Sequence, residues 1–429
     1  MHSSFGLRIS GVTTALVLWA VALAPAEARD EWSQWRGTHR DGHASMFQVP
    51  STWPELPQEV WKIEVGEGFA SPIVSGGAVY LMTRQGDEEV AMALSVKEGK
   101  LRWAKRFPAP YEMHQAAVKY GKGPKSTPVV ADGVVCFLGI DARFSCHQTE
   151  DGKVLWTRDY SDKSAPEETF CGSSMSPLVV DGTVYVHLGD DRAGRFIAAD
   201  LRTGEEKWGW EGQGPGYASP LWIEIEGQPQ VVAFATTDLL GFEPKTGELL
   251  WKRYYPDKWR ENIVDPLVVG ERILISDYEN GTLSLWPKKT EKGWVVEDHW
   301  HNKELTQRMA SPVTDGKLVF GFSNRRKGQL FALDPQTGKV LWEEEGRGGS
   351  NAVLTVVGDW LLVANTAAEL RVMRWQDQAM EEVERYQIAS SEVWAQPAWL
   401  PDGLLVKDKR HLTRFMLVAP PKPPEPLTK

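Results

Sequence analysis

The feature that most constrains the fold of this chain is a glycine followed four residues later by a tryptophan. Each copy comes after a short apolar run and a turn-forming pair such as Asp151-Gly152 or Thr203-Gly204. The copies are Gly99-x-x-x-Trp103, Gly152-x-x-x-Trp156, Gly204-x-x-x-Trp208, Gly247-x-x-x-Trp251 and Gly338-x-x-x-Trp342. A motif that recurs about every 40 to 55 residues indicates a repeat architecture rather than a catalytic signature.

A second series has the same rhythm and consists of a proline that opens an apolar run. Its members are Ser71-Pro72, Thr127-Pro128, Ser176-Pro177, Ser219-Pro220, Asp265-Pro266, Ser311-Pro312 and Gln396-Pro397. The gap between Pro312 and Pro397 is close to two periods, and the segment 350–364 fills it with a turn and two apolar runs. The repeat therefore occurs eight times.

Each repeat contains four short apolar segments separated by Asp-Gly and Thr-Gly turns, which are signals for tight hairpins. Eight such units predict an all-β fold, an eight-bladed β-propeller of four-stranded antiparallel blades. A β-sandwich, the alternative, would explain the short strands but not eight copies in register. The last repeat, 396–417, supplies three strands, and a lone strand lies at about residues 60–65. We expect these two to pair and close the ring, which removes the exposed edges.

The chain divides into four parts. Residues 1–28 have the features of an export signal, with Arg8, an apolar stretch over 9–23 and a cleavage site at Ala26-Glu27-Ala28. A membrane span is the alternative, although the apolar run is shorter than the ~20 residues that a span needs. We expect residues 29–59 to pack on the propeller, 60–418 to form it and 419–429 to be a proline-rich tail. No cysteine follows the apolar run, so a periplasmic or secreted protein without a lipid anchor is expected.

Composition excludes some functions. The net charge of -10 argues against a nucleic-acid partner, which normally needs a basic face. The three cysteines are too few for a disulfide scaffold: Cys136 and Cys146 could pair across a hairpin or be two small buried side chains, and Cys171 is left over. The sequence contains no motif for nucleophilic catalysis, so no catalytic or metal-binding residue is assigned. A monomer is expected, with no transmembrane span in the mature chain.

The fullest copies of the repeat read Ala332-x-Asp334-x-x-Thr337-Gly338-x-x-x-Trp342 and Ala198-x-Asp200-x-x-Thr203-Gly204-x-x-x-Trp208. This pattern resembles the tryptophan-docking repeat of the pyrroloquinoline-quinone (PQQ) family of eight-bladed propellers. The resemblance implies that the motif tryptophans are structural and bury their indoles at the seams between blades. These tryptophans are Trp103, Trp156, Trp208, Trp251 and Trp342.

The family that the repeat resembles has two branches. Quinoprotein dehydrogenases hold PQQ and Ca²⁺ at the channel mouth and commonly carry adjacent cysteines, which this sequence lacks. BamB-like assembly lipoproteins bind partner proteins without a cofactor, and the length and repeat count of this chain favour that branch. The absence of an anchor cysteine departs from it. The opening Trp32-x-x-Trp35-Arg36-Gly37 looks like that of secreted bacterial proteins with PQQ-like repeats, and it is expected to pack on the propeller.

Two faces of the ring differ in sequence. The tight turns lie on one face, and the loop-rich face carries the connections between second and third strands and the links between blades. Residues just before each inner strand should surround the channel mouth on the loop-rich face. They are Phe69, Lys125, Cys171, Tyr217, Arg260, Asn262, Asp265, Arg308, Asn351, Trp394 and Gln396.

The binding residues that we predict are Arg260, Asn262, Asp265, Arg308, Trp394, Tyr217, Arg84 and Arg192. The first three could form an anion clamp or provide oxygen ligands for Ca²⁺, although one Asn and one Asp are too few for a cage. The loop charges could equally be solvated. The sequence thus favours an exported, non-catalytic module that binds proteins, with no cofactor. The alternatives are a PQQ- and Ca²⁺-dependent dehydrogenase of alcohols or sugars and a carbohydrate-binding propeller.

Overall fold

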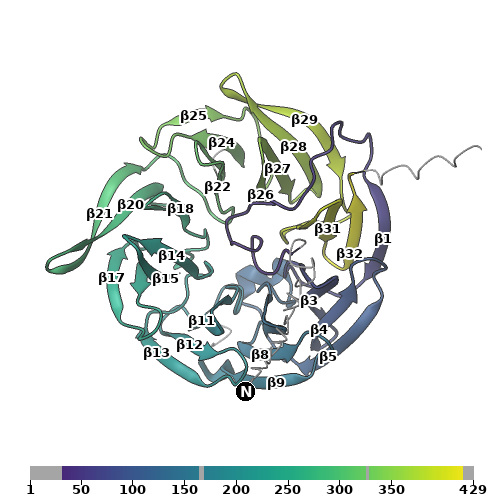
Figure 1. Ribbon diagram of the computed structural model, residues 1–429, viewed down its shortest axis with the longest axis horizontal. Coiled ribbons are helices and arrows are strands. Elements are labelled where there is room, and N and C mark those ends of the chain that lie inside the picture. The colour runs from purple at the N-terminus through teal and green to yellow at the C-terminus, as the bar shows by residue number, and fades with distance from the viewer. Residues whose placement is uncertain (1–30, 164–168, 325–327, 419–429) are drawn as a thin grey trace, which may run out of the picture.

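The computed structural model describes residues 31–163, 169–324 and 328–418, which form eight four-stranded antiparallel sheets arranged as blades around a central channel (Figure 1). The predicted eight-bladed propeller is confirmed. In each blade the chain runs outward from an inner strand whose first residue follows a proline or, in blade 7, an asparagine. The apolar residues of neighbouring blades pack face to face, which produces a ring of buried clusters rather than one central core.

The strands, from the inside of each blade outward, have the following bounds. Blade 1 comprises β2 (Ile73–Ser75), β3 (Ala78–Gln85), β4 (Glu88–Ser95) and β5 (Leu101–Pro108); blade 2, β6 (Val129–Ala131), β7 (Val134–Leu138), β8 (Arg143–Gln148) and β9 (Val154–Asp159); blade 3, β10 (Leu178–Val180), β11 (Thr183–Gly189), β12 (Gly194–Asp200) and β13 (Glu206–Gly212); blade 4, β14 (Leu221–Ile225), β15 (Gln228–Phe234), β16 (Asp238–Phe242) and β17 (Leu249–Tyr254). Blade 5 comprises β18 (Leu267–Val269), β19 (Arg272–Ser276), β20 (Thr282–Thr290) and β21 (Gly293–Asn302); blade 6, β22 (Val313–Thr314), β23 (Val319–Ser323), β24 (Gln329–Leu333) and β25 (Val340–Glu343); blade 7, β26 (Ala352–Val357), β27 (Trp360–Asn365), β28 (Glu369–Gln376) and β29 (Ala379–Gln387); blade 8, β30 (Ala398–Leu400), β31 (Gly403–Lys407), β32 (His411–Met416) and β1 (Gln58–Glu64). Two 3-10 helices, η2 (Gln115–Tyr120) and η3 (Ser161–Lys163), lie in the links after blades 1 and 2.

The ring closes as the sequence predicts, by pairing of the first and last strands. Strand β1 pairs antiparallel with β32, so that Ile63 lies opposite Leu412. Buried Lys407 of β31 links the two ends further, because its Nζ donates to the carbonyl oxygen of Gly68, which follows β1 (3.0 Å), and to that of Asp408 (2.6 Å). Both chain ends of the propeller therefore belong to blade 8.

Five seams between blades share one arrangement, in which an indole covers the glycine of the next blade's outer turn. Trp156, for example, covers Gly204 and donates from Nε1 to the carbonyl of Leu201 at 2.9 Å. A Cβ on Gly204 would lie 2.5 Å from the indole, and its φ of +68° also favours glycine. We call these the docked seams, and their pairs are Trp61 on Gly99, Trp103 on Gly152, Trp156 on Gly204, Trp208 on Gly247 and Trp300 on Gly338.

Two seams, between blades 4 and 5 and between blades 6 and 7, differ, and we call them the charged seams. The receiving blades have long outer hairpins instead of the glycine turn, and the β20–β21 hairpin extends outward from the ring (Figure 1). Trp251 therefore donates to Gln230 of its own blade (2.6 Å). Trp342 is only half-buried and packs against the apolar cluster of blades 6 and 7. Trp251 and Trp342 thus lack the glycine turn that receives the other indoles.

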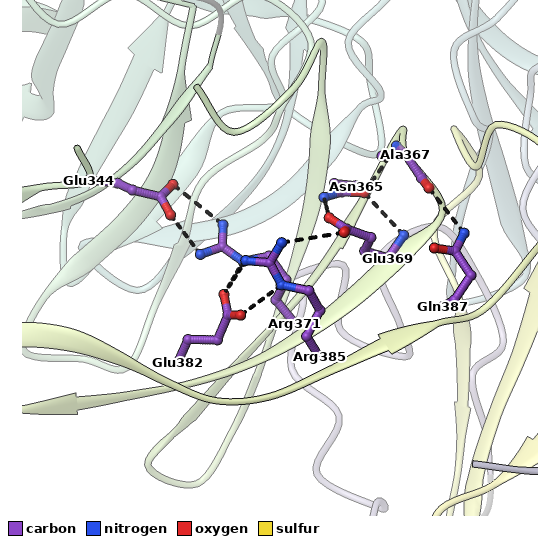
Figure 2. A network of polar contacts seen from close by, with 8 residues as sticks. All are labelled: Glu344, Asn365, Ala367, Glu369, Arg371, Glu382, Arg385 and Gln387. Atoms are coloured by element: carbon purple, nitrogen blue, oxygen red, sulfur yellow. Dashed lines mark hydrogen bonds and ion pairs between the residues drawn. The ribbon is translucent and has the colours of Figure 1, made fainter. Parts of the chain in front are cut away.

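Ion pairs supplement the tryptophan at each charged seam. Arg253 makes two hydrogen bonds to Asp298 across the first (2.9 and 2.7 Å). At the second, Arg371 joins Glu344 of the link after blade 6 to Glu382 of blade 7, at 2.6 and 2.5 Å (Figure 2). Arginine suits this geometry because its planar fork can satisfy carboxylates on both sides.

The two cysteines whose pairing the sequence left open form a disulfide. Cys136 of β7 and Cys146 of β8 are directly opposite one another and are bonded. Cys171 is a free thiol. No helix in the described parts of the chain is long and apolar enough to cross a membrane. The export signal and the proline-rich tail that the sequence predicts lie outside the described residues.

Candidate functional site

The proline series of the sequence forms a hydrogen-bonded ring around the channel. The backbone N–H of the residue before the proline donates to the side-chain oxygen of the equivalent residue in the next blade. Six consecutive bonds of 2.8 to 3.2 Å run from blade 8 through blade 6, and they involve Gln396, Ser71, Thr127, Ser176, Ser219, Asp265 and Ser311. Asp265, a predicted ligand residue, is thus also the blade-5 member of this ring.

The segment that precedes β1 fills the channel itself (Figure 1). Trp32 pairs with Val74 of blade 1, and Ala44 donates its N–H to Val356 of blade 7 (2.9 Å), so the segment is anchored on the two blades that flank blade 8. Between these anchors two arginines enter the channel and are almost completely buried.

The two arginines donate to backbone carbonyls of residues just before the inner strands of blades 3 and 6. Arg36 donates from Nη2 to the carbonyl of Pro312 (2.5 Å) and lies 3.9 Å from a carboxylate oxygen of Asp265. Arg40 donates to the carbonyls of Pro177 (2.9 Å) and Ser176 (3.1 Å). Burial lowers the pKa of Arg36 and lowers that of Arg40 to about 10, and in both cases Asp265 opposes the shift. A guanidinium is not deprotonated in proteins, so both side chains carry positive charge into the channel.

On the loop-rich side of this filling lies a cavity of about 170 Å³. Trp35, whose Nε1 donates to Asp265 (2.5 Å), is among its lining residues. The aromatic walls contact one another: Trp394 lies 5.5 Å from the ring of Tyr120 and 6.2 Å from that of Phe69. Every blade contributes to the cavity, which is lined by Trp35, Phe69, Tyr120, Lys125, Phe170, Cys171, Ser174, Ser176, Tyr217, Ser219, Ile263, Asp265, Met309, Ser311, Asn351 and Trp394.

Of the predicted channel-mouth residues, seven line this cavity, and they are Phe69, Lys125, Cys171, Tyr217, Asp265, Asn351 and Trp394. Arg308 lines a neighbouring groove and forms an ion pair with Glu261 (3.1 Å). Arg260 is exposed and donates to the backbone of Asp191 (2.6 Å). Arg192, on the loop between β11 and β12, is also exposed.

Two of the predicted binding residues use their side chains for hydrogen bonds to backbone carbonyls. Asn262 is buried and donates to the carbonyls of Ala235 (2.8 Å) and Thr236 (3.3 Å), which holds the link before blade 5. Arg84, in β3 of blade 1, is buried and donates to the carbonyl of Ala109 (2.9 Å) in the link to blade 2. Arg260, Asn262 and Asp265 therefore point in three directions and do not form one clamp, because the link between blades 4 and 5 turns sharply at Arg260 (φ +57°).

No sequence pattern pointed to the lining residues Trp35, Tyr120, Phe170 and Met309 or to the two channel arginines as channel residues. Tyr120 and Phe170 lie in long links whose path no local pattern fixes. The signal for Trp35 and Arg36 was present as a Trp-Arg pair in the opening segment, but only the closed ring shows that this segment enters the channel.

Burial changes the acid–base chemistry of the cavity. It raises the pKa of the Cys171 thiol to about 11, partly offset by Lys125, so the thiol is neutral. Burial also lowers the pKa of Lys125, whose Nζ donates to the carbonyls of Gly121 (3.0 Å) and Gly123 (3.1 Å). Neither group has the partner that would make it a nucleophile or base.

The residues of the cavity do not fit PQQ held by Ca²⁺. Its single carboxylate, Asp265, already contacts Trp35, Ser219, Ser311 and Arg36. Among the residues described, no three acidic, histidine or cysteine side chains gather to hold a metal ion. Ca²⁺ takes six to eight oxygen ligands, and this donor set cannot provide them.

Comparison with known proteins gives two kinds of relative. A family model described as outer membrane protein assembly factor BamB matches residues 112–344, more than half of the chain. BamB of Yersinia pestis is 30% identical over 154 residues, which are 35% of this chain and 36% of that protein. A polyvinylalcohol dehydrogenase of a Pseudomonas species is 31% identical over 153 residues, 34% of this chain and 23% of that enzyme. These matches span well under two thirds of either relative.

A solved structure shows the same architecture. The quinohemoprotein alcohol dehydrogenase of Comamonas testosteroni superposes with a TM-score of 0.68 over 94% of this chain and 82% of that one, at 14% identity. At this identity the likeness shows the fold alone.

Proposed function

This chain belongs to the family described as outer membrane protein assembly factor BamB, and from that premise we propose that it is an exported, non-catalytic propeller that binds protein partners in the bacterial periplasm or cell envelope. The observation that carries the proposal is the contrast between a channel filled by the chain's own arginines and a loop-rich face that exposes aromatic rings. A filled channel leaves recognition to the surface.

The exposed rings on the loop-rich face are paired with cations. Trp259 is 57% exposed, and the Nζ of Lys258 lies 4.9 Å from its ring centroid. Tyr278 is 51% exposed, with the guanidinium of Arg308 at 5.8 Å. Tryptophan, tyrosine and arginine are the residue types most enriched at the energetic centres of protein interfaces. These two pairs therefore support a partner-binding face.

A polar groove of about 690 Å³ is lined in part by Tyr278 and Arg308. It shares Tyr120, Met309 and Trp394 with the cavity of about 170 Å³ described above, which we call the channel-mouth cavity. Its charged lining residues are Lys119, Arg308, Arg347 and Glu392. Arg308 is already paired with Glu261, which leaves Lys119 and Arg347 as the cations that favour an acidic partner surface.

Site-specific photo-crosslinking in the native host tests this proposal. A benzophenone amino acid at position 259 or 278 should give a discrete adduct with one partner protein. The matched control places the same group at Glu150, which is exposed on the tight-turn face. Adducts at position 150 of equal strength, or none at 259 and 278, would contradict partner binding through the loop-rich face.

The alternative function is a PQQ- and Ca²⁺-dependent dehydrogenase, and its support is the similarity to relatives described as polyvinylalcohol dehydrogenase and quinoprotein ethanol dehydrogenase. Titration of the purified protein with PQQ and Ca²⁺ separates the two. A ligand that binds the native state raises its melting temperature by mass action. We expect no shift at millimolar ligand, and stabilisation at micromolar concentrations would overturn the non-catalytic assignment.

A further inference from the structure

We propose that the channel-mouth cavity is a binding site for a small carboxylate that carries a single flat apolar ring. This inference goes beyond the proposed partner binding, because it concerns a different set of residues and a small ligand. It rests on the hydrogen-bonding groups of the cavity, on the charges beneath it, and on its walls and size.

Several hydrogen-bond donors that line the cavity are not used within the described chain. Asn351 is only 6% exposed, and its side-chain amide makes no hydrogen bond within the described chain. Lys125 has given two of its three N–H groups to carbonyls, which leaves one. Ser176 and Ser219 accept backbone N–H groups through Oγ, so each hydroxyl group can still donate a hydrogen bond. The Asn351 amide is not among the fully buried polar atoms that lack a partner, so it keeps accessible surface and is open to a ligand in the cavity.

The carboxylate of the cavity already has its donors. Asp265, the one carboxylate that lines the cavity, receives the indole of Trp35 and the N–H of Ser219. Beneath it the guanidiniums of Arg36 and Arg40 share this buried carboxylate, and the other acidic group that acts on Arg36, Asp41, is half-buried. An anion therefore suits the site better than a neutral or cationic ligand.

The position of Asn351 in the repeat explains why its side chain lacks the hydrogen bond that the equivalent residues make. In six blade-to-blade steps the side chain at this position accepts an N–H from the preceding blade. Blade 7 lost the proline of the series, and the ring of bonds is interrupted on both sides of it. The Asn351 side chain therefore takes no part in the ring of hydrogen bonds and lines the cavity instead.

The remaining walls select a flat apolar group. Phe69, Tyr120, Tyr217 and Trp394 offer ring faces or edges at which an aromatic ligand packs well. The volume of about 170 Å³ is close to that of an engineered apolar cavity that holds benzene and is below the ~300 Å³ at which sites for larger ligands begin. One ring and one carboxylate therefore fit, whereas a tricyclic cofactor is too large.

Phenylacetate is the probe, and benzyl alcohol is its neutral counterpart. Calorimetric titration of the full folded protein should give a Kd for phenylacetate of about 0.1 to 1 mM, as expected for about ten heavy atoms. Benzyl alcohol should bind at least tenfold more weakly. Absence of phenylacetate binding at 10 mM, or equal binding of the alcohol, would overturn the proposal.

Variants locate the site. Asn351→Leu and Lys125→Met should each weaken phenylacetate about tenfold, whereas Lys122→Met, an exposed control in the same link, should leave the Kd unchanged. Equal affinities in all three would place the ligand elsewhere and overturn the assignment. Melting curves verify that each variant is folded.

A second readout needs no variant. Cys171 is the free thiol and lines the cavity, so saturating phenylacetate should slow its labelling by methyl methanethiosulfonate at pH 8.5 at least fivefold. Unchanged labelling would contradict occupation of the cavity.

A carboxylate beside one flat ring is present both in a free aromatic acid and in a peptide whose last residue is aromatic. A peptide ending in phenylalanine, tested with a free and with an amidated terminus, distinguishes these sources. Competition by the free-terminus peptide alone assigns the site to chain ends, and no competition by either assigns it to free acids. Crosslinking at positions 259 and 278 is independent of this result, so either proposal can fail without the other.

Discussion

The docked seams and the charged seams join neighbouring blades of the same ring by different chemistry. At a docked seam, an indole buries its face on a glycine and donates one hydrogen bond, as Trp156 does on Gly204. At the charged seam between blades 6 and 7, Trp342 is half-buried, and Arg371 bridges two glutamates instead. The difference follows from one local feature of the receiving blade. Where the outer hairpin is long, its turn does not meet the indole of the blade before it: at Gly293, in the turn of blade 5, an added Cβ would find no atom within 4 Å.

The comparison predicts that removal of an indole costs most at a docked seam. Trp156→Ala should lower the free energy of unfolding by about 3 to 5 kcal/mol, because a buried aromatic leaves a cavity. Trp342→Ala should cost about half as much, since the Trp342 side chain is only partly buried in the folded protein. Urea denaturation of both variants measures the difference. Equal losses would mean that the two kinds of seam depend equally on tryptophan.

A pair of glycines separates the effect of docking from that of backbone strain. Gly204 and Gly182 have similar positive φ values, +68° and +65°, but only Gly204 faces an indole. Gly182→Ala should cost about 1 to 2 kcal/mol, the strain of that conformation alone. Gly204→Ala should cost at least about 2 kcal/mol more, because its Cβ must displace Trp156. Denaturation midpoints test this, and similar losses would refute the close packing of the seam.

At the charged seam the corresponding change is Arg371→Met. It leaves Glu344 and Glu382 without their shared partner and should cost about 1 to 3 kcal/mol. Arg385→Met serves as the control, because Arg385 pairs with Glu382 from an exposed position and such pairs contribute less than about 1 kcal/mol. The same unfolding experiment applies. If the control costs as much as Arg371→Met, the bridging position has no special role.

Acid should weaken the charged seam selectively, with the smallest effect of the four. Burial alone would raise the pKa of Glu382, but hydrogen bonds from Arg385 and Arg371 hold it below its ordinary value. A depressed pKa stabilises the fold above the unfolded value of about 4.3, and this contribution is lost as the pH falls through the folded pKa. The cost of Arg371→Met should therefore shrink between pH 6 and pH 3, while that of Trp156→Ala stays constant. A parallel decline of both would contradict this origin.

Much of the candidate site was predictable because propeller blades repeat. The position before each inner strand could be read from the proline series, so Phe69, Lys125 and Asn351 were expected at the channel mouth, where they line the cavity. Directions of side chains were not predictable. Asn262 and Arg84 face backbone carbonyls because links between blades must satisfy their own polar groups, and these links follow no repeat.

The sequence by itself determined the number of blades and the closure of the ring, since these depend on local patterns that recur. Only the tertiary structure decided which residues meet. The glycine and tryptophan of one Gly-x-x-x-Trp copy do not dock on one another: each glycine receives its indole from the blade before it. Trp61 and Trp300 therefore dock without belonging to the motif, and Trp251 and Trp342 carry the motif without a glycine turn to cover. Contacts between blades depend on the neighbour's turn, which no single repeat encodes.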